Sequence, residues 1–417
     1  MKKFFILFLW FATIIYAVIW TFENPEKIEK IKGEFKKNEK VETKVLTVGS
    51  KNITANSFTV NLLQVLEINS KTAFVTYPSN IKKFDPTNLT IFTQTGQKIN
   101  KNVSEKINLP NHFTLERNGG VKTIFYLEDK AFALISSNEK GCYFASIIFL
   151  EKGEEIFRSK CLPEDPSNND FNGLGSSNVH IGDSILLSLG TPEKHISKNS
   201  LLAQDDNSMF GKILEITKKD LNEVLEKNSK NLKVKIFSKG HRVPQGLTVL
   251  NNKVFNVEHG PKGGDELNQV IKGKNYGWPV VSYGTNYQKN KGGDGKSIKI
   301  NHENENYEEP LFAFVPSVGI SALNNCPSVL KNYYKKPCLI ALSLYGNDLR
   351  KGHSLVVFLL NEDLDKVHSI EKIFLDGLIL RHFITDTKNV IYEDKDGAIF
   401  VSADKKGIYK IEFTDFR

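Results

Sequence analysis

The feature that most restricts the fold is a long succession of short apolar runs that are separated by turn residues. The clearest part spans 389–413, "NVIYEDKDGAIFVSADKKGIYKIEF", where three strand-like runs alternate with Asp-Lys-Asp-Gly and Lys-Lys-Gly turns. Similar runs occur at 72–78, 122–129, 183–190 and 247–260. The pattern predicts an all-β body of antiparallel strands, in which only "KKDLNEVLEKN" (218–228) reads as a helix.

So many short strands leave a sandwich, a barrel or a propeller as possible folds. A propeller blade has four strands and runs about 40–50 residues. Residues 45–417, roughly 370 residues, therefore suit six or so blades with long loops, although no crisp blade signature recurs. We predict a β-propeller domain over 45–417.

The N-terminus predicts a membrane segment. Lys2 and Lys3 precede an uncharged run at 4–22, "FFILFLWFATIIYAVIWTF", which as a helix would span about 28 Å. No small-residue cleavage pattern follows, so residues 1–22 favour an uncleaved signal anchor over a signal peptide. The paired lysines place the body outside the cytoplasmic membrane, in the periplasm or an equivalent compartment. Residues 23–44, rich in Glu and Lys, predict a charged stalk.

Charge and cysteine usage narrow the function classes. The net charge of +8 comes from lysines that are interleaved with acids, which argues against a nucleic-acid partner. The four cysteines contain no CxxC pair, which favours disulfides over zinc. The local pairing joins Cys142 with Cys161 and Cys326 with Cys338; four buried thiols are the alternative.

One stretch concentrates the residues that carry chemistry: 257–284, "VEHGPKGGDELNQVIKGKNYGWPVVSYG". Its glycines at 260, 263 and 264 allow positive-φ turns that aim backbone carbonyls inward. Asp265 and Glu266 add anionic oxygens, and the combination suits Ca²⁺. The alternative is a structural turn whose acids cap neighbouring amides.

A family resemblance follows from this stretch and its neighbours. The segments "GHRVPQGL" (240–247), "EHGPKGGDELN" (258–268), "KGKNYGWPVVSYG" (272–284) and "PSVGIS" (316–321) resemble the soluble quinoprotein glucose/sorbosone dehydrogenase family, which contains PQQ-dependent aldose sugar dehydrogenases. The resemblance is weak before residue 170. It implies a six-bladed β-propeller that binds pyrroloquinoline quinone (PQQ) on its axis, uses Ca²⁺ and oxidises the anomeric hydroxyl of aldose sugars.

The resemblance also implies individual cofactor contacts. Arg242 matches an arginine that contacts the quinone, and Asp265 matches an acid on the cofactor side. Arg381, in "LILRHF", occupies one of two arginine positions of an RIRD-like segment. Cations suit the site because PQQ carries three carboxylates, which favour guanidinium partners.

Four further positions match metal ligands of the family. Gly260 and Pro261 match residues whose carbonyls hold the cofactor-linked Ca²⁺. Glu266 and Tyr276 resemble ligands of a second, structural Ca²⁺.

The chain departs from the family pattern at its general base. The family uses a histidine in an H-x-G-G-R-like segment, but the corresponding stretch 169–193 has Asn172 and no histidine at that place. His180 follows eight positions later and is expected to be a packing or surface residue. His241 and His259 flank the cleft motifs, and His259, beside Gly260, is the better substitute base and a candidate cofactor contact.

Other departures remove polar cofactor contacts. Val243, Ile379 and Tyr345 stand where the family has asparagine, arginine and lysine, so the resemblance implies weaker PQQ binding.

These observations predict PQQ-dependent oxidation of the anomeric hydroxyl of an aldose, diverged at the catalytic histidine and coupled to an external electron acceptor. The alternative is a catalytically degenerate, Ca²⁺-braced propeller that binds carbohydrate or a protein partner. A third hypothesis is a propeller hydrolase or lyase that uses the cleft's Ca²⁺ and a histidine.

Overall fold

The computed structural model describes residues 43–417 apart from 46–50, 55–56, 102, 164–166, 288–294, 297, 346–352 and 376. The predicted anchor (1–22) lies outside the described residues, as does the predicted stalk except for its last two positions. No helix in the described part of the chain is long and apolar enough to cross a membrane.

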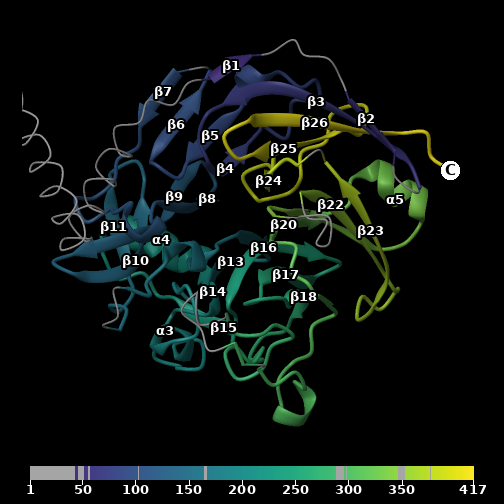
Figure 1. The fold of residues 1–417 in the computed structure, drawn as a ribbon. Coiled ribbons are helices and arrows are strands. Elements are labelled where there is room, and N and C mark those ends of the chain that lie inside the picture. Colours follow the sequence, from purple (N-terminus) through teal and green to yellow (C-terminus); the bar gives the residue numbers. More distant parts are fainter. Residues whose placement is uncertain are drawn as a thin grey trace, which may run out of the picture.

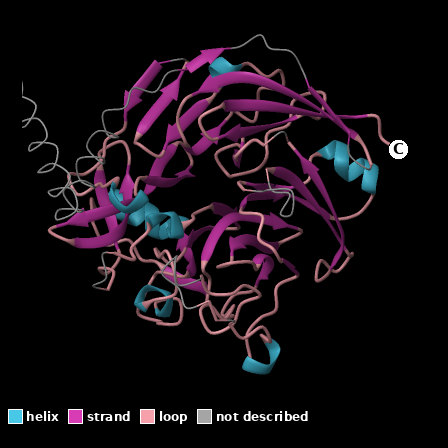
Figure 2. Ribbon diagram, viewed as in Figure 1, coloured by secondary structure: helices cyan, strands magenta, loops and turns pink. Residues whose placement is uncertain are grey.

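The strands form six antiparallel sheets arranged as blades around a common axis (Figures 1 and 2), which confirms the predicted six-bladed β-propeller. The first strands of the six sheets, β4, β8, β12, β16, β20 and β24, contact one another around the ring and are therefore innermost. The first three blades, from the axis outward, are β4(Thr72–Thr76), β5(Thr90–Thr93), β6(Gln97–Asn100), β7(Val103–Lys106); β8(Val121–Leu127), β9(Lys130–Glu139), β10(Cys142–Phe149), β11(Glu154–Arg158); and β12(Asn178–Ile181), β13(Ser184–Leu189), β14(Lys212–Thr217), β15(Lys235–Lys239).

The fourth and fifth blades have the same order. They are β16(Val243–Leu250), β17(Lys253–His259), β18(Asp265–Val270), β19(Phe312–Phe314); and β20(Ile320–Asn325), β21(Cys338–Ser343), β22(Ser354–Leu360), β23(Val367–Phe374).

The sixth blade is built from both ends of the chain. Its inner strands are β24(Leu380–Phe383), β25(Ile399–Ala403) and β26(Gly407–Thr414). Its fourth strand is β3(Thr59–Ile68), which pairs with β26 from Thr59–Thr414 to Glu67–Gly407. The short strands β1(Thr43–Val45) and β2(Lys51–Thr54) pair with β3 as well. The two ends of the chain therefore close the ring together.

The core lies between neighbouring blades. Every residue of β8, β21 and β25 is buried, because each of these strands has a blade packed on both faces. A strand that is covered on both sides reads as a continuous apolar run rather than an alternating one. The sequence "CLIALS" of β21 and "IFVSA" of β25 follow that pattern.

Helices are few and short (Figure 2). The predicted helix is confirmed as α4(Lys218–Glu226), whose N-cap Thr217 accepts a hydrogen bond from the Asp220 amide. It buries Leu221 and Val224 against the cluster between the second and third blades. The remaining helical turns are α3(Lys198–Leu201), α5(Ser328–Tyr334) and the 3₁₀ turns η1(Pro86–Asn88), η2(Glu116–Asn118), η3(Phe171–Leu174) and η5(Glu303–Glu305).

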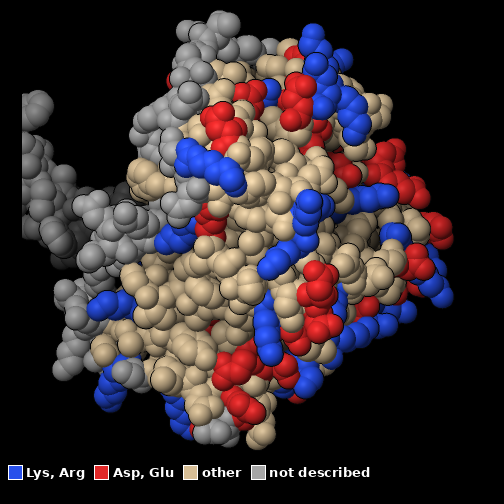
Figure 3. All heavy atoms as spheres, turned by 90° about the vertical axis from the view of Figure 1, so that its right-hand side faces the viewer, with Lys and Arg blue, Asp and Glu red and all other residues tan. Residues whose placement is uncertain are grey.

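The predicted cysteine pairing is confirmed. Cys142, at the start of β10, is bonded to Cys161, and Cys326 is bonded to Cys338 of β21. On the face shown in Figure 3, Lys and Arg alternate with Asp and Glu rather than forming one basic stripe, as the charge pattern predicts.

Candidate active site

A cavity of about 520 Å³ opens among the loops that join the fourth and fifth blades. Five segments line it: the residue before β16, the turn between β17 and β18, the residues at 285 and 287, the segment that leads into β20, and the residue at 345 after β21. The lining residues are Arg242, His259, Gly260, Pro261, Lys262, Gly263, Asp265, Thr285, Tyr287, Val315, Pro316, Ser317, Gly319 and Tyr345. The structure thus brings five of the predicted cofactor and metal positions to one cavity: Arg242, His259, Gly260, Pro261 and Asp265.

The cavity floor depends on the glycines at 260–264. Gly263 and Gly264 have φ values of 93° and 70°, and a Cβ at Gly260 would lie 2.2 Å from the Gly264 carbonyl oxygen. Side chains would therefore strain or obstruct this turn. The backbone, rather than side chains, forms this part of the wall.

Asp265 joins this turn to the next blade. It is 1 % exposed, and its Oδ2 accepts hydrogen bonds from the amides of Val318, Gly319 and Ile320 at 3.0, 2.6 and 3.2 Å. Its Oδ1 accepts a bond from the Gly260 amide at 3.2 Å. Asp265, the predicted cofactor-side acid, lines the cavity. Its four backbone contacts hold the turn at Gly260 against the segment that leads into β20.

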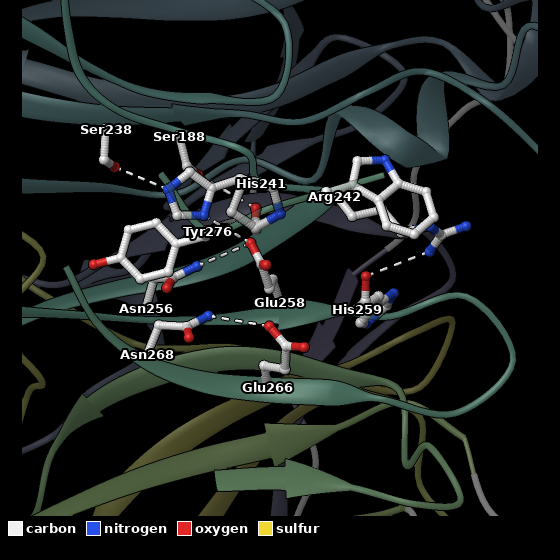
Figure 4. Close-up of polar contacts among 12 residues, drawn as sticks. Ser188, Ser238, His241, Arg242, Asn256, Glu258, His259, Glu266, Asn268 and Tyr276 are labelled. Carbon is white, nitrogen blue, oxygen red and sulfur yellow. Dashed lines mark hydrogen bonds and ion pairs between the residues drawn. The ribbon is translucent and has the colours of Figure 1, made fainter. Parts of the chain in front are cut away.

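Arg242 presents a cation to the cavity. Its Nη1 donates to the carbonyl oxygens of Gly260 at 2.6 Å and His259 at 3.4 Å, and its Cζ lies 5.1 Å from the centre of the Trp278 ring (Figure 4). Its buried Nε has no hydrogen-bond partner among the described residues. The guanidinium is therefore fixed in orientation while part of its donor capacity is unused.

His259 ends β17 and lines the same cavity. Burial lowers its pKa below the ordinary value, and the nearby charges of Arg242 and Arg381 lower it further, against the opposing effect of Asp265. Its Nε2 is buried and finds no hydrogen-bond partner in the described part of the structure. Burial thus favours the neutral imidazole of His259, which is the form that a general base requires, and one of its ring nitrogens has no hydrogen-bond partner among the described residues.

The predicted metal ligands fall in two places. The Gly260 carbonyl accepts from Arg242, and the Pro261 carbonyl accepts from the Tyr287 hydroxyl at 3.4 Å, both at the cavity. Glu266 and Tyr276 belong instead to a network of buried polar side chains at β17 and β18 (Figure 4). Among the residues that the structure describes, no group of three or more His, Cys, Asp or Glu side chains is arranged to hold a metal ion.

The buried network contains more acceptors than donors. Glu258 and Glu266 lie opposite each other on β17 and β18, as do Asn256 and Asn268. Both asparagine Oδ1 atoms lack a hydrogen-bond partner among the described residues. Burial, together with the charge of Glu258, raises the pKa of Glu266 well above its usual value.

His241, predicted as a possible substitute base, belongs to this network and is 0 % exposed. Its Nε2 lies 2.8 Å from the Ser238 hydroxyl and its Nδ1 lies 3.0 Å from a Glu258 oxygen, while Tyr276 stacks on the ring at 4.6 Å (Figure 4). Both ring nitrogens have partners and His241 does not line the cavity, which argues against it as the substitute base.

Arg381 lies away from the cavity lining, on β24. It forms a two-point ion pair with the buried Asp404, with Nε 2.9 Å from Oδ1 and Nη2 bonded to Oδ2. The predicted cofactor arginine is therefore already neutralised by a neighbouring acid.

The loop that corresponds to the family's base contains no titratable replacement at the matching position. Asn172 is exposed in η3, and its amide donates to Asp170 Oδ1 at 2.9 Å. His180 lies in β12 beside Lys218 and Lys388 and is absent from the cavity lining, as expected for a packing residue.

Sequence patterns gave no indication of Glu193. It is 4 % exposed, accepts hydrogen bonds from Ser200 and from the Thr191 hydroxyl (3.1 Å), and lies within the electrostatic reach of Arg242. Burial raises the pKa of Glu193 to about 7 despite the opposing charge of Arg242. Only the fold brings this acid behind the cavity arginine, 49 positions away in the chain.

The chain resembles known proteins in sequence. The family profile described as Glucose / Sorbosone dehydrogenase matches residues 149–409, more than half of the chain. The aldose sugar dehydrogenase YliI of Escherichia coli (strain K12) is 35% identical over 127 residues, which are 29% of this chain and 33% of that protein. The quinoprotein glucose dehydrogenase B of Acinetobacter calcoaceticus is 34% identical over 90 residues, which are 21% of this chain and 18% of that protein. The chain therefore spans a third or less of these curated relatives in sequence.

Solved structures show the same fold over most of the chain. A glucose dehydrogenase structure has a TM-score of 0.62 at 20% identity and covers 84% of this chain and 98% of its own. The soluble aldose sugar dehydrogenase of Escherichia coli in the apo-form has a TM-score of 0.60 at 20% identity and covers 89% and 99%. The PQQ-bound aldose sugar dehydrogenase of Streptomyces coelicolor has a TM-score of 0.52 at 15% identity and covers 90% and 98%. With the propeller, the cavity turn and the profile match in agreement, the chain belongs to the glucose/sorbosone dehydrogenase family.

Proposed function

We propose that this protein is a PQQ-dependent dehydrogenase that oxidises the anomeric hydroxyl of an aldose sugar. The proposal rests above all on His259, which lines the same cavity as Arg242 and whose buried Nε2 has no hydrogen-bond partner among the described residues. One group there can accept a proton and the other can hold an anion, which are the two functions that the reaction requires of the protein.

The cavity suits PQQ in size and in chemistry. A volume of about 520 Å³ accommodates a planar tricyclic molecule, and Arg242 and Lys262 supply positive charge for its carboxylates. The glycine-rich turn allows a flat ring system to approach the backbone closely. Bound there, the quinone would supply the two-electron acceptor for the hydride that leaves the anomeric carbon.

The residues of this chain would bind the cofactor, accept the proton and hold the cavity walls in place. Arg242 fixes the anionic edge of the cofactor, since its guanidinium is already oriented by the Gly260 carbonyl. His259 Nε2 accepts the proton of the sugar hydroxyl, and burial, which lowers the pKa of this histidine, favours the neutral form that can accept it. Asp265 keeps the two walls in register through its four backbone contacts.

Of the two predicted calcium sites, we propose calcium only for the buried network at Glu266. The unpartnered Oδ1 atoms of Asn256 and Asn268 lie in the network of Glu258 and Glu266, an all-oxygen donor set that suits a hard cation. At the cavity, a cation bound to the Gly260 carbonyl would have to share that oxygen with the Arg242 guanidinium. The cofactor-linked Ca²⁺ at Gly260 and Pro261 therefore stays a prediction.

The location of the protein is part of the proposal. Two disulfides are usual in proteins that mature outside the reducing cytoplasm, which supports an extracytoplasmic body. The apolar run at 4–22 is the proposed anchor. Such a dehydrogenase would pass its electrons to an external acceptor.

Reconstitution of the full-length protein tests the enzymatic proposal. The purified protein is incubated with Ca²⁺ and titrated with PQQ, and the reduction of an acceptor dye is followed with a panel of aldoses. Saturable PQQ binding and sugar-dependent dye reduction are expected, with loss of turnover but not of PQQ binding in His259→Asn. His180→Asn, outside the cavity, is the matched control. The absence of saturable PQQ binding by the wild-type protein would overturn the proposal.

The second candidate is a propeller that binds a carbohydrate or protein partner without catalysis. Two observations favour it: no histidine stands at the place that matches the family's base, and Arg381 is paired with Asp404. Sugar binding by calorimetry, with no dye reduction in the presence of bound PQQ, would select this alternative.

A further inference from the structure

The innermost strands share an irregularity that places one residue of each strand in an equivalent position near the axis. In β4, β8, β16, β20 and β24 the pairing with the next strand skips one residue close to the strand's start. The skipped residues are Ala73, Lys122, Gln245, Ser321 and Arg381. Such bulges re-aim a side chain and are frequent beside active sites.

The bulged residues lie around the axis because their strands follow one another around the ring. A small cavity of about 20 Å³ marks this region and is lined by Gln245 itself and by Thr123, Ala322 and His382, which directly follow three other bulged residues. Lys122 and Arg381 are the two cations of the set. Arg381 has a carboxylate partner in Asp404, whereas Lys122 forms no ion pair within the described residues.

Lys122 is a buried amine whose donors are mostly unused. It is 6 % exposed, and its Nζ donates to the Asn118 carbonyl oxygen at 2.8 Å. No second acceptor for this amine is found in the part of the chain that the structure describes. An ammonium has three donors, so two remain without a protein partner.

A second buried lysine shows what a structural amine looks like in the same fold. Lys212 is 0 % exposed, and its Nζ donates to the carbonyl oxygens of Leu202, Ala203 and Phe210 at 2.7, 2.9 and 2.9 Å. All three of its donors are satisfied by one loop. Lys122 has one acceptor where Lys212 has three, so Lys122 keeps donors that a ligand could use.

Lys122 also lies beside the loop that carries Asn172. The carbonyl of Asn118 accepts from Lys122, and the side-chain amide of Asn118 donates to Asp170 Oδ1 at 3.1 Å. The same Asp170 oxygen accepts from the Asn172 amide. On its other side, this loop contacts the strand that follows Arg242, since the Ser176 amide donates to the Pro244 carbonyl at 2.9 Å. Lys122 and Arg242 therefore flank one loop at the axis.

We propose that Lys122 is an anion-binding residue that takes a carboxylate at the axial end of the site, supplied either by the cofactor or by an acidic sugar. The proposal rests on the proposed function for its choice of ligands, but the carboxylate contact itself can be tested without turnover. The two free donors of the amine would satisfy a carboxylate, and the added positive charge would offset the family cations that Ile379 and Tyr345 replace.

Binding of this kind would be linked to a proton. Burial lowers the pKa of Lys122 to about 7, and the charges of Arg381 and Lys71 add to the effect against that of Asp170. An arriving carboxylate stabilises the ammonium and raises its pKa. Near pH 8, where the empty site holds mostly neutral amine, carboxylate binding should therefore take up close to one proton; near pH 5.5 it should take up almost none.

The experiment uses the full-length wild-type protein with Lys122→Met and Lys122→Gln, and with Lys212→Met as the matched buried control. Each protein is titrated by calorimetry with PQQ, and separately with glucuronate and glucose in the absence of quinone. Both titrations are made near pH 8 in two buffers that differ in ionisation enthalpy, so that proton uptake is measured directly.

Two results would support the proposal and identify the source of the carboxylate. If the cofactor supplies it, the Lys122 variants should bind PQQ about 10- to 100-fold more weakly and lose the proton uptake. If an acidic sugar supplies it, PQQ binding should stay unchanged while the preference for glucuronate over glucose disappears. The thermal midpoint of Lys122→Met should not fall, whereas that of Lys212→Met should.

The outcomes also separate this proposal from the proposed function. A wild-type protein that binds PQQ and oxidises sugars, with no proton uptake toward either ligand and no effect of the Lys122 changes, would overturn the role of Lys122 alone. A wild-type protein that fails to bind PQQ would overturn the proposed function, and glucuronate binding with proton uptake would still support the carboxylate site.

Discussion

The Nη1 atom of Arg242 lies 2.6 Å from the carbonyl oxygen of Gly260, so a fixed cation borders the turn that the family uses for cofactor and metal. The contact orients the guanidinium before any ligand arrives. Preorganised donors contribute more to the binding of an anion than mobile ones, because little side-chain entropy is lost on binding.

Replacing this arginine should therefore weaken PQQ binding more than it weakens folding. For Arg242→Gln we expect the Kd for PQQ to rise by about 10- to 100-fold, since charged hydrogen bonds are lost. Titration of the quinone by protein fluorescence measures the change. Arg158→Gln, on an outer strand and exposed, is the control and should leave the Kd unchanged; an equal effect in both variants would contradict the assignment.

Acid should inactivate the enzyme through His259. The neutral imidazole is the active form, and its pKa is lowered by burial and by Arg242 and Arg381, so turnover should persist below the usual titration range of histidine and fall only at lower pH. His259→Asn should lower kcat by about 10²- to 10⁴-fold and abolish this acidic limb. The pH profile of kcat with PQQ at saturation measures both effects; a retained acidic limb in the variant would exclude His259 as the base.

Asp265 should be a stability residue as much as a site residue. Asp265→Asn places an amide donor where one carboxylate oxygen now accepts three backbone amides, so we expect a loss of about 3 kcal/mol in the free energy of unfolding. Chemical denaturation measures it. Asp206→Asn, in an exposed ion pair with Lys239, should have little effect.

Glu193 should make the protein less stable as the pH rises toward neutrality. Its pKa is about 7 in the folded protein, above the ordinary 4.5, so between pH 4.5 and pH 7 unfolding releases a proton from Glu193. A rise in pH over this range therefore lowers the free energy of unfolding. We expect the wild-type protein to lose on the order of 3 kcal/mol relative to Glu193→Gln between about pH 4.5 and pH 7. Denaturation curves of both proteins, recorded at several pH values in this range, measure the difference. A difference in free energy of unfolding that does not change with pH would contradict the prediction.

The two disulfides should differ in their sensitivity to reductant. Cys326 and Cys338 are 0 % and 1 % exposed, whereas Cys161 is exposed and Cys142 half-buried. A thiolate must reach a sulfur to exchange with it, so mild reduction should open Cys142–Cys161 first. Alkylation at timed intervals followed by peptide mass spectrometry gives the order, and simultaneous opening would contradict it.

Much of the fold and part of the site could be predicted from the sequence because they depend on local pattern. The hairpin residues of 389–413, the helix at 218–228 and the cysteine spacing are short-range signals, and the 257–284 stretch identified the cavity turn. The ion pair of Arg381 with Asp404, the burial of His241 and the acid behind Arg242 depend on which blades meet. Lys122 could not be singled out from the sequence, because no local pattern shows that the β8–β9 pairing skips this residue.

The pairing of β3 with β26 sets the order in which the protein can mature. β3 has no partner in the sixth blade until residues 407–414 have left the ribosome. The ring of blades therefore cannot close until synthesis is nearly complete. Premature stop codons near the C-terminus should therefore be as damaging as deletions near the start, and new termini placed in an outer loop should be tolerated if the native ends are joined.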